Sequence, residues 1–404
     1  MRLLQNATPT KKRIINKSIM KAITISLAFV YCAETWSDTR VYFAGLSYIG
    51  NASSMVSASP FGASIINDPL ELARYNKVLK SAVDNRETKG ISFSSELGYS
   101  NSGNALSIAF AITEEQFQVE ETGSGYYAVK ATTFAQIVLF DFTDKRIIST
   151  VPVITSYTDS PSEISEDYRS KIYQTIYFDQ SKKINLVNAF VARLGDVNFE
   201  KPFNNWNIKV RNVTSTALTD KYLTKYNVDK DVFKTRVATQ FTSAMSKRLG
   251  IPILPYTKGQ AIGGSMAMRF ANTDAVQLTL PPSDYYIDLK VLGFNKKIMK
   301  ETASVTYPSF IAGLRISIGD VGFDELLFSE KVQSGRILKV SKNLEINEWN
   351  EFNNSLSVLS DEFSKQVAKP EKAWFKEKMF TQKTFKKVKK IFTKLEQNVF
   401  DNLR

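Results

Sequence analysis

Two amphipathic hairpins, one in each half of the 404-residue chain, constrain the fold more than any other feature of the sequence. In each hairpin, apolar residues occupy one face of the first strand and an aspartate marks the turn. At a constant offset of 176 positions, the sequence matches Phe134, Val138, Phe140, Phe142 and Asp144 to Phe310, Leu314, Ile316, Ile318 and Asp320. Helix and strand patterns surround both hairpins in the same order, so we predict two tandem copies of one α/β module.

The first module is predicted to span residues 38–200 and to mix strands with helices. Its clearest helix signal is Asp68 followed by Pro69, which is an N-cap residue followed by a proline at the first helical position. Two more helices are expected at 162–179 and 182–194. Alternating apolar residues predict strands at 40–46, 91–97, 105–112, 134–142 and 147–154.

The second module is predicted to span residues 201–369. Its strongest helix signal is at 231–249, where apolar residues recur every four positions until Gly250, a residue type that often ends helices. A closing helix with apolar residues spaced by threes and fours follows the last strand, and Pro370 then breaks the pattern. The strands expected in this module lie at 206–213, 251–256, 285–294, 310–318 and 325–332.

Residues 1–37 are predicted to be a signal peptide. A basic run precedes an apolar stretch at 22–30, which is too short to span a bilayer, and small residues stand three positions and one position before Asp38. We therefore expect cleavage before Asp38 and an exported protein that is periplasmic, associated with the outer membrane, or secreted. The alternatives are lipidation at Cys32 and a buried amphipathic first helix.

The positive charge lies at the two ends of the chain. Of the formal charge of +13, residues 1–37 carry +5 and residues 369–404 carry +7, which leaves +1 for the body at 38–368. A nucleic-acid-binding domain usually carries its basic field over a whole face. Because the body is nearly neutral and the chain carries an export signal, nucleic acid is not an expected partner.

The composition excludes the commonest catalytic and metal sites. The chain has no histidine, and its one cysteine lies in the predicted signal peptide. Nucleophile systems that use histidine as the base and zinc sites that use imidazole are therefore excluded. We predict no enzyme activity, no cofactor and no metal site.

Three sequence motifs resemble binding sites, but two lack residues that such sites need and the third has a simpler alternative. The glycine-rich stretch at 258–265 lacks the lysine and hydroxyl residue of a phosphate-binding loop. The aspartates at 227–231 have the spacing that opens a calcium loop, but Val232 and Ala238 occupy positions that need glycine and glutamate, and helix capping explains the same aspartates. Four turn aspartates would form an acidic cluster if the modules packed together, or would simply face water: Asp141, Asp144, Asp320 and Asp324.

The segment at 370–404 is predicted to be a basic amphipathic helix that follows the two modules of an α+β fold, in which antiparallel hairpins pack on helices. Apolar residues recur at helical intervals, and lysines fill the opposite side. Three occupants are open for this helix: an anionic membrane or polymer, a helix of a partner, and the body of the chain itself. The predicted interaction residues are Phe385, Lys386, Lys387, Val388, Lys389, Lys390, Phe392, Lys394 and Leu395.

The order of opening strand, amphipathic helix, strand and late hairpin resembles a group of bacterial envelope domains. The hairpins that carry the resemblance lie at 137–153 and 314–332. The group includes the amino-terminal domain of the Tol-system translocation protein, the periplasmic part of the curli secretion channel, and auxiliary lipoproteins of ABC transporters. The resemblance implies an assembly or transport accessory without catalysis, and it assigns no functional residue.

The export segment, the repeat and the resemblance together predict a non-enzymatic exported envelope protein, an accessory or structural subunit of a secretion, transport or surface-assembly complex. Other envelope proteins are the expected partners, an anionic membrane surface is a further candidate, and oligomer formation is left open. The alternative is a secreted effector or toxin-like protein whose basic tail binds membranes.

Overall fold

The computed structural model describes most of the two modules and the C-terminal segment. The predicted signal peptide at 1–37, Cys32 and most of the glycine-rich stretch at 258–265 lie outside the described residues. Within the described part, no helix has both the length and the hydrophobicity needed to cross a bilayer. The described residues are 39–49, 55–85, 91–94, 105–121, 125–165, 167–197, 199, 206–256, 261–262, 265–269, 276–342 and 346–401.

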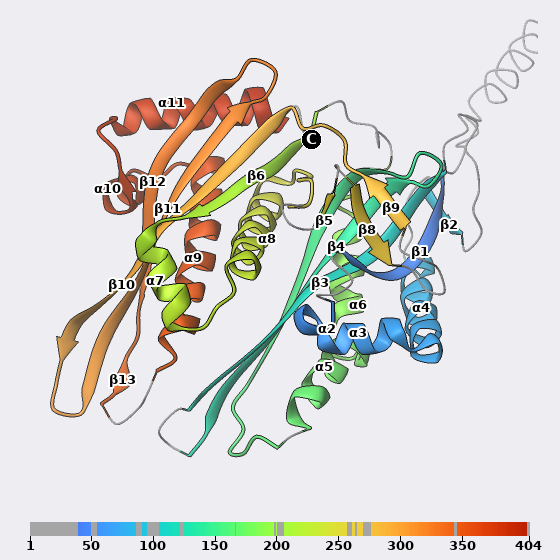
Figure 1. Cartoon of the computed structure of the whole chain (residues 1–404), viewed down its shortest axis with the longest axis horizontal. Helices are drawn as coiled ribbons and strands as arrows, with labels where there is room; N and C mark the ends of the chain where they lie inside the picture. Colours follow the sequence, from blue (N-terminus) through green and yellow to red (C-terminus); the bar gives the residue numbers. More distant parts are fainter. Residues whose placement is uncertain are drawn as a thin grey trace, which may run out of the picture.

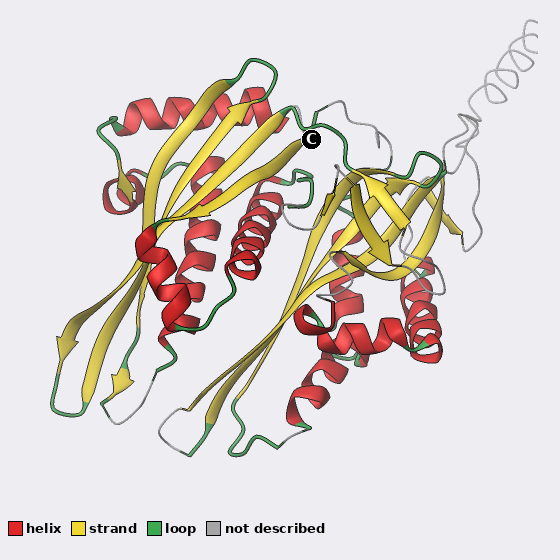
Figure 2. Ribbon diagram, in the orientation of Figure 1, coloured by secondary structure: helices red, strands yellow, loops and turns green. Residues whose placement is uncertain are grey.

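Two β-sheets form the frame of an α+β fold (Figures 1 and 2). The first sheet has the strand order β2-β1-β3-β4-β5-β9-β8-β7, and the second has the order β14-β12-β11-β10-β6 with β13 beside β11. The strands of the first sheet are β1 (Thr39–Ile49), β2 (Ile91–Ser94), β3 (Leu106–Glu121), β4 (Tyr127–Asp141), β5 (Arg146–Asp159), β7 (Ala261–Ile262), β8 (Ser265–Arg269) and β9 (Val276–Thr279). The strands of the second sheet are β6 (Ile208–Ser215), β10 (Tyr285–Glu301), β11 (Val305–Asp320), β12 (Glu325–Ile337), β13 (Val340–Ser341) and β14 (Met379–Phe380).

Each sheet packs one face, here called its inner face, against the helices of its own module. The helices of the first module are α2 (Met55–Ala58), α3 (Pro60–Asn67), α4 (Pro69–Asp84), α5 (Tyr168–Phe178) and α6 (Leu186–Leu194). Those of the second are α7 (Ala217–Lys225), α8 (Lys230–Leu249), α9 (Glu348–Ala368), α10 (Lys372–Lys378) and α11 (Phe385–Leu395), after which a π-helical turn covers Glu396–Phe400. In Figure 1, α8 and α9 lie between the two sheets, so that the order of layers is helices, first sheet, helices, second sheet.

The two sheets repeat the same strand pairing at a constant offset. Leu106 of β3 pairs with Asp141 of β4, and Tyr285 of β10 pairs with Asp320 of β11, so that both partners move by 179 positions. In both sheets the opening strand runs parallel to the first hairpin strand, as β1 does to β3 and β6 to β10. The two tandem modules expected from the sequence therefore share their sheet topology.

Irregularities of the pairing recur at the same offset. The two turns also match, because Lys145 and Asp324 both adopt a positive φ, of 50° and 49°. A β-bulge, which is an extra residue in one strand of a pair, bends that strand at a particular position of the ladder. Because bulges recur at equivalent positions of the two sheets, they support a shared module. The register shifts lie between Phe43 and Gly45 opposite Ile108 and Ala109, between Ile112 and Glu114, and between Leu139 and Phe140; their counterparts are at Ile287 and Asp288, Val291 and Gly293, and Ile318 and Gly319.

The offset of 176 expected from the sequence is wrong by three positions. Side chains alternate along a strand, so an odd error matches residues of opposite faces. Phe140 lies on the outer face of the first sheet, whereas Ile316, its expected counterpart, lies in the inner core of the second module. The error arises because β4 is buried on both faces and reads as a nearly continuous apolar run.

Several local predictions are confirmed with their expected chemistry. The Asp68 side chain caps α4 by accepting a hydrogen bond from the amide of Leu70 at 2.9 Å, with Pro69 as the first helical residue. Helix α8 ends at Gly250, whose φ of +66° is left-handed. The Asp229 side chain caps the start of α8, so the capping interpretation of the calcium-like spacing is the observed one.

Other local predictions are wrong. The segment at 251–256 forms no ladder strand and makes one isolated bridge, between Lys209 and Leu254. The helix expected from residue 162 begins at Tyr168 as α5. The central hairpin strands are longer than predicted from their apolar residues. Pairs that include polar residues continue each ladder toward the hairpin end, as the pair of Glu121 with Tyr127 does.

A segment of the predicted second module completes the first sheet. Strands β7, β8 and β9 pair with one another, and β9 and β8 join β5 and β1. The outer face of the first sheet is apolar at this end, where Val138 and Phe140 are fully buried together with Leu278 of β9. Burial of this apolar surface stabilises the packing of β7, β8 and β9 on the first sheet. The predicted second module at 201–369 is therefore not a separate unit, because part of it belongs to the first sheet.

Candidate functional site

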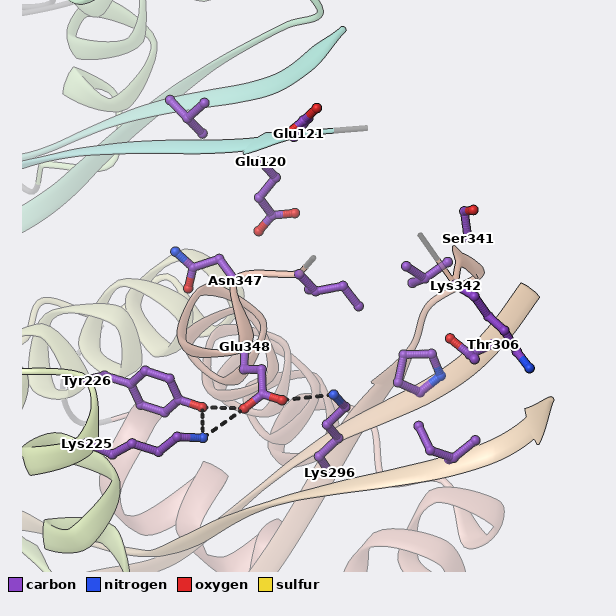
Figure 3. Close-up of a pocket in the computed structure, with 15 residues that line it drawn as sticks. Glu120, Glu121, Lys225, Tyr226, Lys296, Thr306, Ser341, Lys342, Asn347 and Glu348 are labelled. Atoms are coloured by element: carbon purple, nitrogen blue, oxygen red, sulfur yellow. Dashed lines mark hydrogen bonds and ion pairs between the residues drawn. The ribbon is translucent and has the colours of Figure 1, made fainter. Parts of the chain in front are cut away.

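A polar cleft lies between the long hairpins of the two modules (Figure 3). Its volume is about 1000 Å³. One wall comes from the end of β3, the other from β10, β11 and the start of α9. The residues that line it are Val119, Glu120, Glu121, Lys225, Tyr226, Lys296, Ile298, Thr306, Pro308, Val340, Ser341, Lys342, Ile346, Asn347 and Glu348.

Glu348 is the centre of the polar contacts in this cleft. It is the first residue of α9, and its carboxylate accepts a hydrogen bond from Lys296 Nζ at 2.8 Å and from Lys225 Nζ at 3.2 Å. The Tyr226 hydroxyl also donates to it, while Lys225 Nζ lies 2.9 Å from the same hydroxyl. Figure 3 shows the four side chains converging from α7, β10 and α9. The cluster therefore ties three separate segments of the second module together.

The surroundings of Glu348 hold it in the charged form. Burial by itself raises the pKa of this carboxyl group, but the hydrogen bonds from Lys296, Tyr226 and Lys225 outweigh burial and lower the pKa to about 2. A carboxylate at the first turn of a helix is also favoured by the helix dipole. The cluster is a structural clamp, since each of its polar groups is already satisfied by another.

We expect the clamp to make stability depend on pH in acid. A lowered folded-state pKa gives stability that is present above the unfolded value of about 4.5 and is lost as pH falls toward about 2. Because Glu348 is 26% exposed, solvent screening reduces the contribution to about 1 kcal/mol. Denaturant unfolding from pH 6 to pH 2 should show that loss in the wild type and a smaller loss in Glu348→Gln. Equal pH profiles for the two proteins would contradict the prediction.

The opposite wall of the cleft carries a carboxyl group in a different setting. Glu120 Oε1 accepts a hydrogen bond from Asn350 Nδ2 at 3.5 Å, which joins β3 of the first module to α9 of the second. Burial, and next the negative charge of Glu351, raise the pKa of Glu120. The cleft thus presents two acids with opposite pKa shifts, although each is explained by contacts within the chain.

A second and closer contact between the modules lies beside the cleft. Glu114 of β3 accepts three hydrogen bonds at one carboxylate oxygen, from Arg236 Nη2 at 2.7 Å, from Arg236 Nε at 3.0 Å and from Gln116 Nε2 at 3.1 Å. The two side chains are 14% and 19% exposed. Thr150 of β5 also donates to the carbonyl of Ile253 at 2.5 Å. These contacts hold α8 and the segment that follows it against the outer face of the first sheet.

Three of the apolar interaction residues predicted in the tail are part of the core of the second module, and the fourth, Phe385, is half-buried. Val388, Phe392 and Leu395 are 1%, 2% and 2% exposed, and Phe385 packs against Phe375. The Phe392 ring lies 5.4 Å from that of Phe328 in β12. Of the three occupants left open by the sequence, the body of the chain itself is the one that covers this side, so these apolar residues are not a free membrane-binding or partner-binding surface.

The lysines predicted in the same helix remain at the surface. Helix α11 is anchored through its apolar side, and its opposite side therefore presents a fixed row of cations to solvent. The exposed members of the row are Lys386, Lys387, Lys389, Lys390 and Lys394. The structure thus retains the charged half of the predicted interaction surface and buries the apolar half.

Two of the four turn aspartates, Asp141 and Asp320, bind the backbone of their own turns. Asp141 accepts hydrogen bonds from the amides of Thr143 and Asp144, and Asp320 accepts one from the amide of Phe323. Aspartates at the first position of a turn commonly bind its backbone in this way. Among the described residues, no group of three or more acids is arranged to hold a metal ion.

Sequence reasoning missed the contacts that form the cleft and join the modules. Glu348 and Lys225 are 123 positions apart, and Arg236 and Glu114 are 122 positions apart. A charged residue within an amphipathic pattern looks like an ordinary solvent-facing residue, so no local signal marks these side chains. How the two modules pack against each other could have been predicted only by knowing which face of the first sheet α8 covers.

Comparison with known proteins gives no family assignment. No family model matches the chain, and no curated protein matches it. Partial likeness is found to solved structures. A minor lipoprotein from Acinetobacter baumannii is 10% identical over 40% of this chain and 90% of its own, with a TM-score of 0.20. A hypothetical protein from Chlamydia trachomatis is 11% identical over 40% of this chain and 93% of its own, with a TM-score of 0.19.

A third structure, a protein of the family DUF330 from Xanthomonas campestris, is 11% identical with a TM-score of 0.16. That match covers 22% of this chain and about half, 49%, of the other. None of the three is described as a Tol, curli or ABC-transporter protein. Scores at this level carry no assignment, so the resemblance expected from the sequence stays a prediction.

Proposed function

We propose that the protein is an exported envelope protein that works by binding, as an accessory or structural subunit of a secretion, transport or surface-assembly complex. The observation that carries the proposal is the unequal cover of two equivalent sheet faces. On the outer face of the first sheet, Ala109 and Ala111 are fully buried. At the offset of 179, their counterparts on the second sheet are Asp288, which is half-buried, and Lys290, which is exposed.

The stacking of layers supports a role in assembly. Helix α8, the segment at 251–256 and β9 cover the outer face of the first sheet, whereas the same face of the second sheet ends the stack with exposed side chains. A series of layers that ends in an open sheet offers a broad, rigid surface for another protein. The contact of Arg236 with Glu114 holds α8 against the first sheet, and the clamp at Glu348 holds α7, β10 and α9 together within the second module.

Fractionation of the native cells tests the proposal. We expect the mature chain to lack residues 1–37, to fractionate with the envelope, and to migrate in a complex larger than the monomer after mild solubilisation. A predominantly cytoplasmic protein that retains residues 1–37 would contradict export. An exported protein that remains monomeric under crosslinking in intact cells would contradict the assembly role.

A second candidate function, contact with an anionic membrane, is favoured by the row of lysines on α11. Each cation near an anionic lipid surface contributes about 1 kcal/mol. Removal of residues 371–404 is not a clean test, since it would also remove Val388 and Phe392 from the core. Charge reversal of surface lysines leaves the buried side of α11 intact.

We predict that the wild type binds vesicles of anionic phospholipid and that the triple variant Lys386→Glu, Lys387→Glu and Lys390→Glu lowers this binding by about a hundredfold. The matched control reverses three exposed lysines of the first module, Lys77, Lys182 and Lys183, and should bind as the wild type does. Sedimentation with vesicles measures both. Absence of wild-type binding, or equal loss in the control, would exclude α11 as a membrane contact.

A further inference from the structure

The outer face of the second sheet is strongly basic. Its outward side chains include one acid, Asp288, which pairs with Arg211 over the ring of Tyr286. Within the described part, no ion-pair partner is found for Lys290, Arg315 or Lys331, all of which are exposed. The basic residues directed to this face by the strand register are Lys209, Arg211, Lys290, Lys297, Arg315 and Lys331.

An apolar trough crosses the same face between these cations. It has a volume of about 380 Å³ and is lined on one side by Leu218 of α7 and on the other by Phe380 of β14. These two side chains are 51% and 56% exposed. Its floor includes Gly293 and Gly313, where the lack of side chains brings the backbone of the sheet to the surface. A basic face with an apolar trough fits a ligand that has both apolar and acidic parts.

The first module shows what covers this face in the same fold. At the offset of 179, Glu114 corresponds to Gly293, and Glu114 is the residue that receives Arg236 from α8. A helix therefore lies over the equivalent region of the first sheet and is held there by an ion pair. The equivalent face of the second sheet has the opposite charge, because its exposed side chains are cations, whereas the first sheet carries the Glu114 carboxylate.

We propose that this face binds an amphipathic helix of another envelope protein, with its apolar side in the trough and acidic residues on its flanks. The inference rests on the proposed function as an assembly subunit and specifies the chemistry of the partner. Lys290, Arg315 and Lys331 pair with the acidic flanks, and Leu218 and Phe380 contact the apolar side. A second copy joined through the same face would bring like charges together, which opposes that arrangement.

Binding of designed peptides to the full mature chain tests this inference. The first probe is a fluorescent helical peptide of about 18 residues with leucines on one side and glutamates on both flanks; the second has the same leucines with lysines on the flanks. We expect fluorescence anisotropy to show binding of the glutamate peptide, weakened by salt, and little binding of the lysine peptide. Failure to bind the glutamate peptide, or equal binding of both peptides, overturns the inference.

Two variants locate the binding. Reversal of Lys290, Arg315 and Lys331 to glutamate should weaken binding of the glutamate peptide by about tenfold or more. Gly313→Leu should also weaken it, because the new side chain fills the trough; a Cβ at Gly313 lies 3.4 Å from Leu292 Cβ, so the sheet can accept it. The control is the reversal of Lys386, Lys387 and Lys390 on α11, which should leave the affinity unchanged. Equal weakening by the control overturns the assignment.

Other partners for this face would give different results. Tighter binding of a single-stranded oligonucleotide or of anionic vesicles through the same three cations would overturn a helix as the partner. A wild-type dimer in light scattering that becomes a monomer on reversal of these cations would assign the face to a second copy. A reversal variant that still joins its envelope complex overturns this docking face alone, whereas loss of envelope location in the wild type overturns the proposed function itself.

Discussion

Replacement of Phe392 by alanine should lower the free energy of unfolding by about 3–5 kcal/mol. Phe392 is 2% exposed, and its ring lies 5.4 Å from Phe328 and 5.9 Å from Phe363. The substitution leaves a cavity where α11, α9 and β12 meet, and the neighbouring rings are held by their own elements and cannot close it. Denaturant unfolding followed by circular dichroism measures the change.

The matched control for Phe392 is Lys390→Ala, a change in the same helix at a side chain that faces solvent. We expect it to alter stability by less than about 0.5 kcal/mol. The pair tests whether α11 is part of the core of the second module or a detachable tail. A small effect of Phe392→Ala, similar to that of Lys390→Ala, would show that the helix is undocked in solution and that its apolar side is available after all.

Replacement of Arg236 by alanine should cost about 2–3 kcal/mol in the free energy of unfolding. Arg236 donates two hydrogen bonds to Glu114 across the junction of the modules. The Glu114 side chain is only 14% exposed, so removal of Arg236 leaves a poorly solvated carboxylate without its cation. Loss of one partner of a largely desolvated pair is destabilising, because the other charge stays partly buried without its counter-ion. We also expect the two modules to unfold in separate steps in this variant, since α8 loses its polar anchor on the first sheet.

Helix α8 supplies the control for this prediction. Arg248 makes an equivalent two-bond contact with Asp361 of α9, but those side chains are 42% and 45% exposed. Arg248→Ala should therefore cost less than about 1 kcal/mol. A double-mutant cycle of Arg236→Ala with Glu114→Gln isolates the coupling across the junction. A coupling no larger than that of Arg248 with Asp361 would contradict the assigned role.

Local patterns predicted many of the elements. The N-cap at Asp68, the glycine that ends α8 and the long apolar periodicity of α9 each act within one or two helical turns, and the structure shows all three. The repeat was also visible, but its offset was wrong because Val138 and Phe140 are as apolar as the residues of the inner face. A strand buried on both sides does not show in its sequence which side faces its own helices.

The candidate sites depended on contacts between distant segments. The tail is an example: the basic helix expected over 370–404 is instead divided into α10, β14 and α11, and within α11 one side is apolar and the other cationic. The sequence left open what would cover the apolar side, and the structure shows that Phe328 and Phe363 do so. The Glu348 clamp and the contact of Arg236 with Glu114 had no sequence signal, since a charged residue looks alike whether its partner is solvent or another segment.

By itself, the sequence determined the mixed α and β composition, several helix ends and the concentration of charge at the two termini, because these follow from residue type and short-range spacing. Only the tertiary structure decided which face of each sheet is covered, where α11 docks and which charges meet. Those outcomes depend on burial and on pairs more than 100 positions apart, such as Arg236 with Glu114, and the free energy that selects them comes from the packed layers as a whole.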